Sequence, residues 1–396
     1  MSAAGRSAAG RRAVIAGVAD APLRKGVLAT PATPVGVQAV TAVAALAQAG
    51  LTLGDVDGLF TAGTWGVPGS GQFQTVALAE YLGLDPRCAD GTNVGGAAFE
   101  VLLGHAVTAI ETGRCDVVLI SYGSTQRSGR ATRAWALPAF GGQYDFPFGL
   151  PAPIGGYALA AMRYLAESGA TSEHLAEVAV AARAWSALNP AATRREPITV
   201  ADVLDSALIC DPLHVLDCCL VTDGAGAVVV TTAERAADLA RPPVEILGWA
   251  EAQSHWNISQ MPDLVTTGAA RTGPDALAQA GLTLADIDLL EVYDSFTITV
   301  LLTLEGLGVC PRGEAGAFVA AGHTRPGGSL PMNTSGGGLA AAHPGMYGIF
   351  LIIEACRQLW NECGERQVPG ARTALVHGTG GQLSSSATCV LSTERP

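Results

Sequence analysis

The feature that most restricts the fold of this chain is a stretch that occurs twice. The sequence ALAQAGLTL fills residues 45–53 and again residues 276–284, and 12 of the 15 positions in 45–59 match those in 276–290. In each copy an alanine-rich segment typical of a helix ends at a glycine, a common helix terminator. A short acidic turn and an apolar strand follow. Two alanine-rich helices can look alike by chance, but a chance similarity would not extend into the turn and the strand that follow. We therefore expect a duplication, with two α/β halves related by a pseudo-twofold axis.

The rest of the chain continues the alternation of strand and helix. Residues 95–112 are apolar nearly all round, which predicts a helix in the interior between sheets. Residues 124–206 break the pattern and are rich in proline, glycine and aromatic residues, as expected of an insertion that covers a binding site. The predicted organisation is an N-terminal half at 1–123 and 207–240, an inserted loop domain at 124–206, and a C-terminal half at 241–396.

Composition excludes several classes of protein. The chain has 396 residues, is 49% hydrophobic and only 15% charged, and carries 49 glycines, which is typical of a well-buried enzyme. A net charge of −12 argues against nucleic acid as a partner. No apolar run approaches the ~20 residues that span a bilayer, and no apolar region of signal-peptide type follows the basic N-terminal residues, so we expect neither a membrane span nor a signal peptide. The nine cysteines form no C-x-x-C pair, so we predict no metal site and a cytoplasmic protein with reduced thiols.

Four motif blocks identify a family resemblance. They are TNVGGAAFEVL at 92–102, EVYDSF at 291–296, NTSGGGLAAAHPGMYG at 333–348 and HGTGG at 377–381. Together with the duplicated α/β core they resemble the thiolase superfamily, in its sterol-carrier-protein-x, lipid-transfer-like branch. The resemblance extends from residue 12 to residue 393. It implies a five-layer αβαβα core with an inserted loop domain, a homodimer, and an acyl-CoA substrate without a further cofactor.

The sequence departs from true thiolases at the nucleophile. Thiolases carry a reactive cysteine at the start of the buried helix, and Gly96 stands in that place here. The nearest thiol, Cys88, lies eight residues upstream and is interpreted as a small buried hydrophobe. Without a thiolate no acyl-enzyme can form. The chain therefore resembles the cysteine-free, thiolase-like aldolases that shorten steroid side chains. This implies retro-aldol cleavage of a bulky β-hydroxyacyl-CoA to a ketone and a short acyl-CoA, through an enolate held in an oxyanion site.

Five residues are candidates for catalysis. Tyr293 lies where the family binds the thioester oxygen, and its phenol can donate to an oxyanion or relay a proton; the alternative is a packing tyrosine at a strand end. Asp294 either orients Tyr293 or caps the helix that follows. His343 matches the histidine of the family's G-H-P block and is predicted to act as base or acid, the alternative being a core histidine. Tyr347 shares that role or packs. His377 lies where thiolases place a second, acid–base cysteine.

Other residues are candidates for binding the substrate. Gly96 lies at the reacting thioester, and the backbone N–H groups of the terminal glycine turn can hold the enolate. The run NTSGGG lacks the lysine and spacing of a phosphate loop, so its asparagine and glycines are predicted to allow close packing behind His343. Two arginines are candidates for the CoA phosphates, although a solvated basic run is the alternative. The set comprises Gly96, Arg127, Arg130, Asn333, Gly380 and Gly381.

Two other functions remain open. The chain is either the lyase described above, a thiolase or acyltransferase that uses another cysteine such as Cys88, or a non-catalytic scaffold that binds acyl-CoA or lipid. The resemblance also implies a small zinc-ribbon/OB-fold partner subunit that forms a heterotetramer with the homodimer. Any zinc is expected in that partner only.

Overall fold

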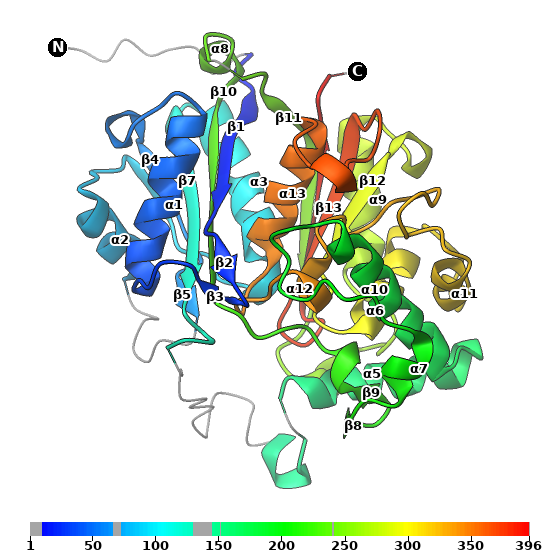
Figure 1. Cartoon of the computed structure of the whole chain (residues 1–396). Coiled ribbons are helices and arrows are strands. Elements are labelled where there is room, and N and C mark those ends of the chain that lie inside the picture. The colour runs from blue at the N-terminus through cyan, green and yellow to red at the C-terminus, as the bar shows by residue number, and fades with distance from the viewer. Residues whose placement is uncertain (1–9, 66–72, 130–144, 151, 240, 396) are drawn as a thin grey trace, which may run out of the picture.

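Both copies of the repeated stretch fold into the same unit in the computed structural model, which describes residues 10–65, 73–129, 145–150, 152–239 and 241–395 (Figure 1). Each copy is a helix followed by a left-handed glycine, Gly50 with φ 72° and Gly281 with φ 68°. Each glycine leads into a turn in which an aspartate accepts a threonine backbone N–H at 2.8 Å, and then into a strand. The elements are α1 (Pro34–Gln48), η1 (Leu53–Asp55), β4 (Gly58–Phe60), and α9 (Ala269–Ala280), η6 (Leu284–Asp286), β12 (Leu289–Val292). The predicted duplication is confirmed.

A second aspartate in each copy attaches the unit to the neighbouring strand. Asp57 accepts the backbone N–H of Val117 at 2.8 Å, and Asp288 accepts that of Thr373 at 2.9 Å. These donors open β7 (Val117–Ser124) and β13 (Thr373–Gly380), which pair in parallel with β4 and β12. The acidic turn therefore binds the start of the neighbouring strand in the same way in both halves.

Within the described residues, ten strands form one sheet in the order β12-β13-β14-β11-β1-β10-β7-β4-β6, with β5 paired to β7. The two halves meet where β1 and β11 pair antiparallel over only two residue pairs. Each half then repeats the same sequence of antiparallel and parallel neighbours outward from this junction. The remaining strands of the sheet are β1 (Ala13–Asp20), β5 (Thr64–Trp65), β6 (Cys88–Asp90), β10 (Gly224–Thr232), β11 (Val244–Gln253) and β14 (Ser385–Ser392).

Helices cover the sheet in layers, as Figure 1 shows. The helices α3 (Ala98–Glu111) and α13 (Gly348–Leu359) lie between the two halves of the sheet. One outer face is covered by α1 with α2 (Gln74–Leu82), and the other by α9 with α10 (Thr297–Leu307). This αβαβα order is the predicted one.

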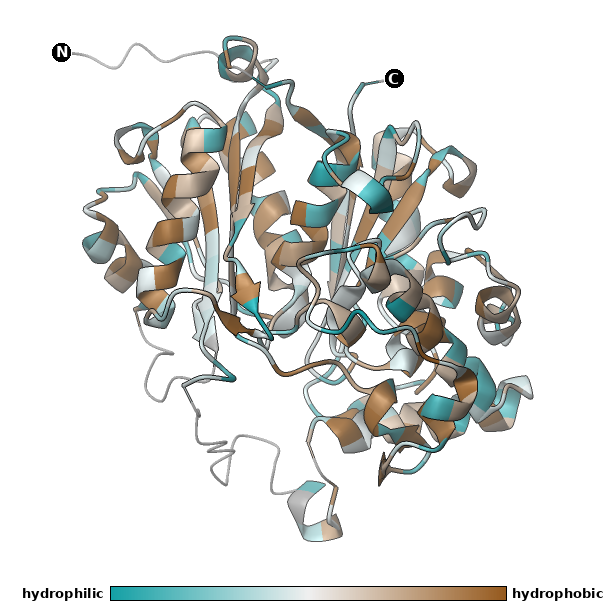
Figure 2. Ribbon diagram, in the orientation of Figure 1, coloured by the Kyte–Doolittle hydropathy of each residue, from teal (hydrophilic) through white to brown (hydrophobic). Residues whose placement is uncertain are grey.

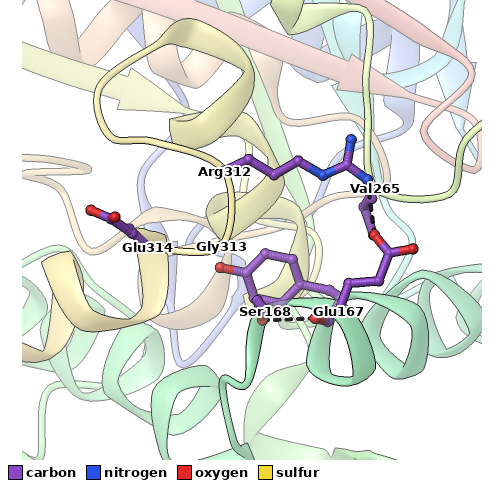
Figure 3. Close-up of a pocket in the computed structure, with 7 residues that line it drawn as sticks. Glu167, Ser168, Val265, Arg312, Gly313 and Glu314 are labelled. Carbon is purple, nitrogen blue, oxygen red and sulfur yellow. Dashed lines mark hydrogen bonds and ion pairs between the residues drawn. The ribbon is translucent and has the colours of Figure 1, made fainter.

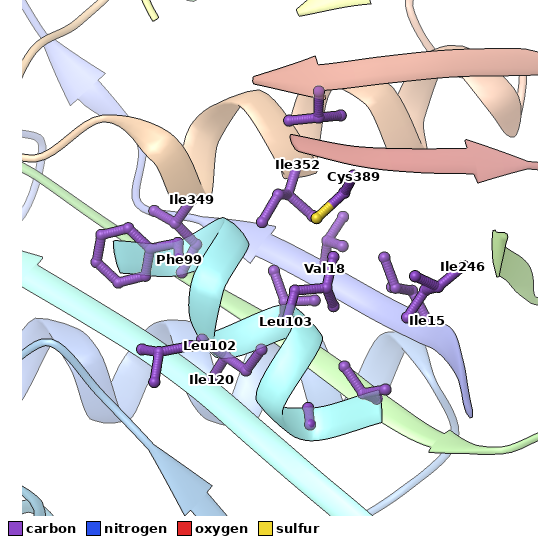
Figure 4. Close-up of a cluster of buried hydrophobic side chains, with 14 of the residues drawn as sticks. Ile15, Val18, Phe99, Leu102, Leu103, Ile120, Ile246, Ile349, Ile352 and Cys389 are labelled. Carbon is purple, nitrogen blue, oxygen red and sulfur yellow. The ribbon is translucent and has the colours of Figure 1, made fainter. Parts of the chain in front are cut away.

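The central layer is the main core. In Figure 4, Phe99 and Leu103 of α3 pack among Ile349 and Ile352 of α13 and Ile15 of β1, and all five side chains are fully buried. Figure 2 shows hydrophobic residues concentrated on the strands and on the helix faces turned toward them. Each such burial contributes roughly 1.5–3 kcal/mol. The apolar character of α3 on all sides, which predicted an interior helix, is thereby explained.

The segment between β7 and β10 leaves the first half of the sheet but packs on the second. Its helices contact α10, α11 and α12, so it bridges the two halves. The segment contains α5 (Ile154–Ser168), α6 (Ser172–Ala187), α7 (Val200–Leu204), β8 (Leu208–Cys210) and β9 (Leu213–His214). Its two later partners are α11 (Ala315–Ala320) and α12 (Gly337–Ala340). Further short elements include β2 (Leu23–Arg24), β3 (Val27–Leu28) and α8 (Ala233–Ala236). None of the helices in the described ranges is both long enough and apolar enough to cross a bilayer.

Candidate active site

Tyr293 and His343 meet where the motif blocks converge. Tyr293 directly follows β12, and its backbone N–H donates to the carbonyl of His377 on β13 at 2.9 Å. The Tyr293 hydroxyl lies 2.9 Å from Nε2 of His343. The same hydroxyl accepts the backbone N–H of Tyr347 at 3.1 Å, so its own proton is free to point to the imidazole. The structure therefore assembles a phenol, an imidazole and a backbone donor in one contact.

Steric crowding explains why position 96 is a glycine in this structure. A Cβ atom at Gly96 would lie 2.3 Å from Cε2 of Tyr293 and 2.4 Å from the carbonyl oxygen of Thr379. Distances below 3.0 Å do not occur between such atoms, so no side chain fits at position 96 beside this tyrosine. The phenol ring occupies the space into which a nucleophile would project.

Burial keeps both partners of this pair neutral. The side chain of His343 is buried, and desolvation lowers its pKa to about 4. Desolvation also raises the pKa of the Tyr293 phenol well above its usual range. At neutral pH the pair is therefore an O–H donor facing a neutral imidazole acceptor. Such a pair can pass a proton to the imidazole when the phenol oxygen receives another one.

Two residues that the sequence did not single out hold the turn of His343. The hydroxyl of Tyr122, at the end of β7, donates to the carbonyl of Pro344 at 2.5 Å and accepts the N–H of Met346 at 3.2 Å. The hydroxyl of Thr222 accepts the backbone N–H of His343 at 3.0 Å. The partner of Tyr122 is 222 residues away in the chain, so no local motif marks this contact. The only available signal was the general rule that a buried tyrosine hydroxyl needs a hydrogen-bond partner.

Tyr347 joins the cluster through both its backbone and its ring. Its hydroxyl lies 3.1 Å from Oγ of Ser335, and its ring stacks at 6.1 Å between centroids on the imidazole of His343. Desolvation raises the pKa of Tyr347 well above the usual range. The phenol therefore stays protonated beside the histidine.

Asp294 has a role different from both predicted ones. Its carboxylate accepts the backbone N–H of Gly338 at 2.7 Å and that of Leu339 at 3.1 Å, at the start of α12. It thus anchors the glycine run and neither binds the Tyr293 hydroxyl nor caps α10. Burial raises the pKa of this carboxyl to about 6, although the two N–H groups oppose the shift.

Asn333 binds the strand that precedes Tyr293. Its side-chain oxygen accepts the backbone N–H of Val292 at 2.8 Å, and its own N–H donates to Leu290 at 3.0 Å. With φ 53° it takes the left-handed conformation that asparagine tolerates better than most residues. Asn333 therefore fixes the loop to β12.

The structure does not bring the side chain of His377 to the cluster. Successive side chains of a strand alternate between faces, and His377 shares the face of Leu375, which packs with α9 and α10. Its Nδ1 lies 2.8 Å from Oγ1 of Thr388, and desolvation lowers its pKa to about 3. The prediction of His377 as acid or base is wrong; only its carbonyl supports Tyr293.

The terminal glycine turn lies beside the start of the central helix. A Cβ atom at Gly95 would fall 2.8 Å from the backbone nitrogen of Gly381 and 3.1 Å from Cα of Gly380. The hydroxyl of Tyr157, on α5, donates to the carbonyl of Gly381 at 2.9 Å. The two glycines therefore lie beside the start of the central helix, next to position 96.

One unpredicted thiol lies near the pair. The backbone N–H of Cys219 donates to the carbonyl of Ser295 at 2.9 Å. Desolvation, followed by the charge of Asp294, raises the pKa of the Cys219 thiol well above its usual range, so it is no thiolate at neutral pH. Cys88 instead opens β6 and lies close to the thiol of Cys115. It takes no part in the contacts described for Tyr293 and His343.

Arg127 lies at the surface above the His343 turn, whereas Arg130 is outside the described residues. A Cβ atom at Gly26 would lie 2.5 Å from Nη1 of Arg127 and 3.2 Å from Cγ2 of both Thr193 and Thr222. The guanidinium of Arg127 therefore lies near Thr222, which binds the backbone N–H of His343. No group of three or more potential ligand side chains in the described part of the chain is placed to hold a metal.

A separate cavity of about 480 Å³ lies at the far end of α5 from Tyr157 (Figure 3). There Arg312 forms ion pairs with Glu167 at 2.9 Å and with Asp263 at 3.1 Å. None of the candidate site residues lines it; the lining consists of Tyr164, Glu167, Ser168, Val265, Arg312, Gly313 and Glu314.

The duplicated core with a tyrosine–histidine pair at its centre defines a thiolase-like α/β protein. A family model described as thiolase C-terminal domain-like matches residues 250–393. The chain is 38% identical over 334 residues to 17-hydroxy-3-oxo-4-pregnene-20-carboxyl-CoA lyase of Mycobacterium tuberculosis, covering 80% of this chain and 83% of that one. It is 33% identical over 321 residues to an acetyl-CoA acetyltransferase of Methanothermobacter thermautotrophicus, covering 80% and 82%.

A solved structure described as an Ltp2-ChsH2(DUF35) aldolase superposes with a TM-score of 0.83 at 32% identity, covering 96% of this chain and 97% of that one. The chain belongs to the thiolase superfamily, in its sterol-carrier-protein-2-like branch.

Proposed function

We propose that this protein is a carbon–carbon lyase that cleaves a bulky β-hydroxyacyl-CoA, of the steroid side-chain type, to a ketone and a short acyl-CoA. The observation that carries the proposal is the Tyr293–His343 contact in the space that a thiolase nucleophile would need. The similarity to a steroid CoA-thioester lyase over most of both chains supports the same chemistry. No cofactor or metal is required for it.

The contacts suggest a complete proton path. The Tyr293 oxygen takes the proton of the substrate β-hydroxyl while the phenol proton moves to Nε2 of His343. The Cα–Cβ bond breaks, the new ketone carbonyl forms, and the electron pair of that bond becomes the thioester enolate. The N–H of Tyr347, aimed at the phenol oxygen, lowers the cost of negative charge there. The imidazolium then returns its proton through Tyr293 to Cα of the enolate, which restores the neutral pair.

The enolate oxygen needs donors in a site without water. We place it between the backbone N–H groups of the helix start at Gly96 and of the turn at Gly380 and Gly381, which lie against each other. Helix starts offer free N–H groups and a partial positive charge. This arrangement stabilises the charge that develops at the carbonyl and not the charge of the bound substrate.

A group of exposed cations beside this site suits the phosphates of CoA. Three segments meet at Gly26: the β2–β3 turn, the loop after β7, and the loop after α6. They carry five cations for which the described residues show no ion pair: Arg24, Lys25, Arg127, Arg194 and Arg195. Such a cluster is unusual in a chain of net charge −12. We call it the basic cluster and assign it to the CoA nucleotide.

The neighbouring buried arginine supports this assignment. Desolvation lowers the pKa of Arg183, and the charge of Arg194 adds to the effect. Asp223, a carboxylate beside the cluster, accepts the backbone N–H groups of Leu28, Arg127 and Ser128. An anionic ligand would therefore relieve repulsion here.

The assembly and the loop domain belong to the same proposal. A related aldolase was solved together with a DUF35 protein. We propose that this chain forms a homodimer that binds a small zinc-ribbon/OB-fold partner, giving a cytoplasmic heterotetramer in which any zinc belongs to the partner. We also propose residues 124–206 as the inserted domain that covers the acyl-CoA site. Co-expression followed by mass measurement of the native complex tests the composition.

The lyase proposal is tested by the products formed without free CoA. The protein, alone and co-purified with the partner, is incubated with a steroid β-hydroxyacyl-CoA. Equal amounts of ketone and short acyl-CoA are expected. A strict requirement for added CoA would instead show thiolysis, and an absence of any turnover with tight binding would indicate a scaffold.

One observation favours a second candidate function, acyl transfer. Cys219 lies close enough to Tyr293 for the two groups to influence each other when ionised, and one relative is an acetyl-CoA acetyltransferase. Mass spectrometry after incubation with acyl-CoA distinguishes the two. The lyase proposal expects no acylated protein, whereas an acyl adduct that disappears in Cys219→Ala establishes transfer.

A further inference from the structure

Glu100 occupies a slot between two glycines that suits an uncharged carboxyl group. It is on α3, one turn after Gly96, and its side chain is only 1% exposed. Neither of its carboxyl oxygens has a hydrogen-bond partner among the described residues. A Cβ atom at Gly348 would lie 2.4 Å from Oε2 of Glu100, and one at Gly378 would lie 2.2 Å from it. The two glycines, on α13 and β13, therefore make the room that the carboxyl fills.

Both glycines are next in sequence to the groups that hold Tyr293. Gly348 follows Tyr347, whose backbone N–H donates to the Tyr293 hydroxyl. Gly378 follows His377, whose carbonyl accepts the Tyr293 backbone N–H. Any change in the volume or hydration of the Glu100 carboxyl thus acts on the two backbone segments that fix the phenol.

The surroundings of Glu100 contain no group that would compensate a negative charge. α13 and β13 present glycine backbone to it, and β14 presents the thiol of Cys389, which donates to the carbonyl of Glu100 at 3.6 Å. No Arg, Lys or His side chain of the described ranges contacts the carboxyl. Isolated buried carboxylates are far less stable than the neutral acid. Burial accordingly raises the pKa of Glu100 to about 8.

We propose that Glu100 is a proton-bearing positioning residue: as the neutral acid it fills the glycine slot and keeps the Tyr293 hydroxyl on His343, and loss of its proton opens the slot and disengages Tyr293. The retained proton links the position of the phenol to pH without any contact with substrate. The kinetic part rests on the proposed lyase function, whereas the structural part does not.

Infrared difference spectroscopy tests the structural part without substrate. The wild-type protein at pH 7 is expected to show the carbonyl band of a protonated, non-hydrogen-bonded carboxylic acid, which disappears between pH 7 and pH 9 and is absent in Glu100→Gln. The matched control is Glu111→Gln, at the exposed end of the same helix, which keeps the band. A wild-type spectrum without the band at pH 7 overturns the proposal, whatever the protein catalyses.

Kinetics test the consequence for Tyr293. Glutamine mimics the neutral acid, so Glu100→Gln is expected to keep wild-type kcat within about threefold at pH 7 and to lose the alkaline decline near pH 8. The Glu111→Gln control keeps that decline. Glu100→Ala, which leaves the slot empty, should lower kcat at every pH. A Glu100→Gln profile that declines like the wild type would show that Glu100 does not control the phenol.

Stability gives a third readout with a defined sign. The folded-state pKa of Glu100 is raised, so between pH 4.5 and pH 8 only the unfolded chain releases this proton. Wild-type stability should therefore fall relative to Glu100→Gln as pH rises through that window, and the difference should level off above it. Equal pH profiles of the two melting temperatures would contradict a buried neutral acid.

Discussion

The ring of Tyr293 and the hydrogen of Gly96 share a space in which no Cβ atom fits, since a methyl group at position 96 would lie 2.3 Å from the ring. The residue that removes the thiolase nucleophile is therefore also the residue that admits the phenol. The two positions form one unit, and a change at either alters the other.

Gly96→Ala is expected to lose nearly all activity. The methyl group must displace the Tyr293 ring from His343, which should lower kcat by at least ~100-fold, and overpacking should cost about 1–3 kcal/mol of unfolding free energy. Steady-state kinetics and thermal melting measure both effects. The matched control is Gly54→Ala, because the second copy of the repeat carries alanine at the equivalent position 285 and a methyl group at Gly54 would meet only one atom, at 3.6 Å. Full activity of Gly96→Ala would show that the contact between Tyr293 and His343 is not needed for catalysis.

Tyr293→Phe tests the hydroxyl alone. Its ring shape is kept, but Nε2 of His343 and the N–H of Tyr347 lose their partner. We expect kcat to drop by roughly 10²–10⁴ and stability to drop by about 1–3 kcal/mol. A variant with normal far-ultraviolet circular dichroism and more than a third of wild-type kcat would rule out the proposed proton path.

Tyr122→Phe tests the support of the histidine turn. The substitution removes one hydroxyl that binds both Pro344 and Met346, without touching the proton path itself. We expect a loss of about 1–2 kcal/mol and a fall in kcat of about tenfold, smaller than for Tyr293→Phe. Equal losses in the two variants would mean that Tyr122 has a direct chemical role.

The neutral state of His343 has a measurable effect on stability at low pH. Its folded-state pKa is lowered from 6.5 to about 4, so in this window the unfolded chain binds a proton that the folded chain does not. Wild-type stability should consequently fall relative to His343→Gln as pH drops from 6.5 to 4, by up to about 3 kcal/mol. Chemical denaturation at several pH values gives the difference, and parallel curves would contradict a buried neutral imidazole.

Removal of charge from the basic cluster should weaken binding without changing the chemistry. Lys25→Ala with Arg127→Ala is expected to raise KM for the CoA thioester about tenfold at unchanged kcat, and to have no effect on the corresponding pantetheine thioester. Arg372→Ala, an exposed arginine at the start of β13, is the control. If the double variant weakens both thioesters equally, the cluster does not bind the nucleotide.

Sequence reasoning succeeded where the signal is local and failed where it depends on strand pairing. The repeat, the interior helix and the Gly96–Tyr293–His343 set were accessible because motifs are contiguous. The side chain of His377 was misplaced because a shift of one residue in a strand changes its face. Asp294 was assigned to the wrong helix because α12 follows more than 40 residues later. Tyr122 and Glu100 act through contacts that no local pattern encodes.

The position of β10 between β1 and β7 governs how the chain can be made. A ribosome releases β1 and β7 long before residue 232, so the nascent first half carries a gap one strand wide with two unpaired edges. Until β10 enters, those edges can pair with strands of other chains. The helices α5 and α6, between β7 and β10, pack against α10 and α11, which are synthesised later still. We therefore expect the nascent chain to need chaperones until β10 has been synthesised. Chains truncated before residue 232 should aggregate and should not fold as an independent half.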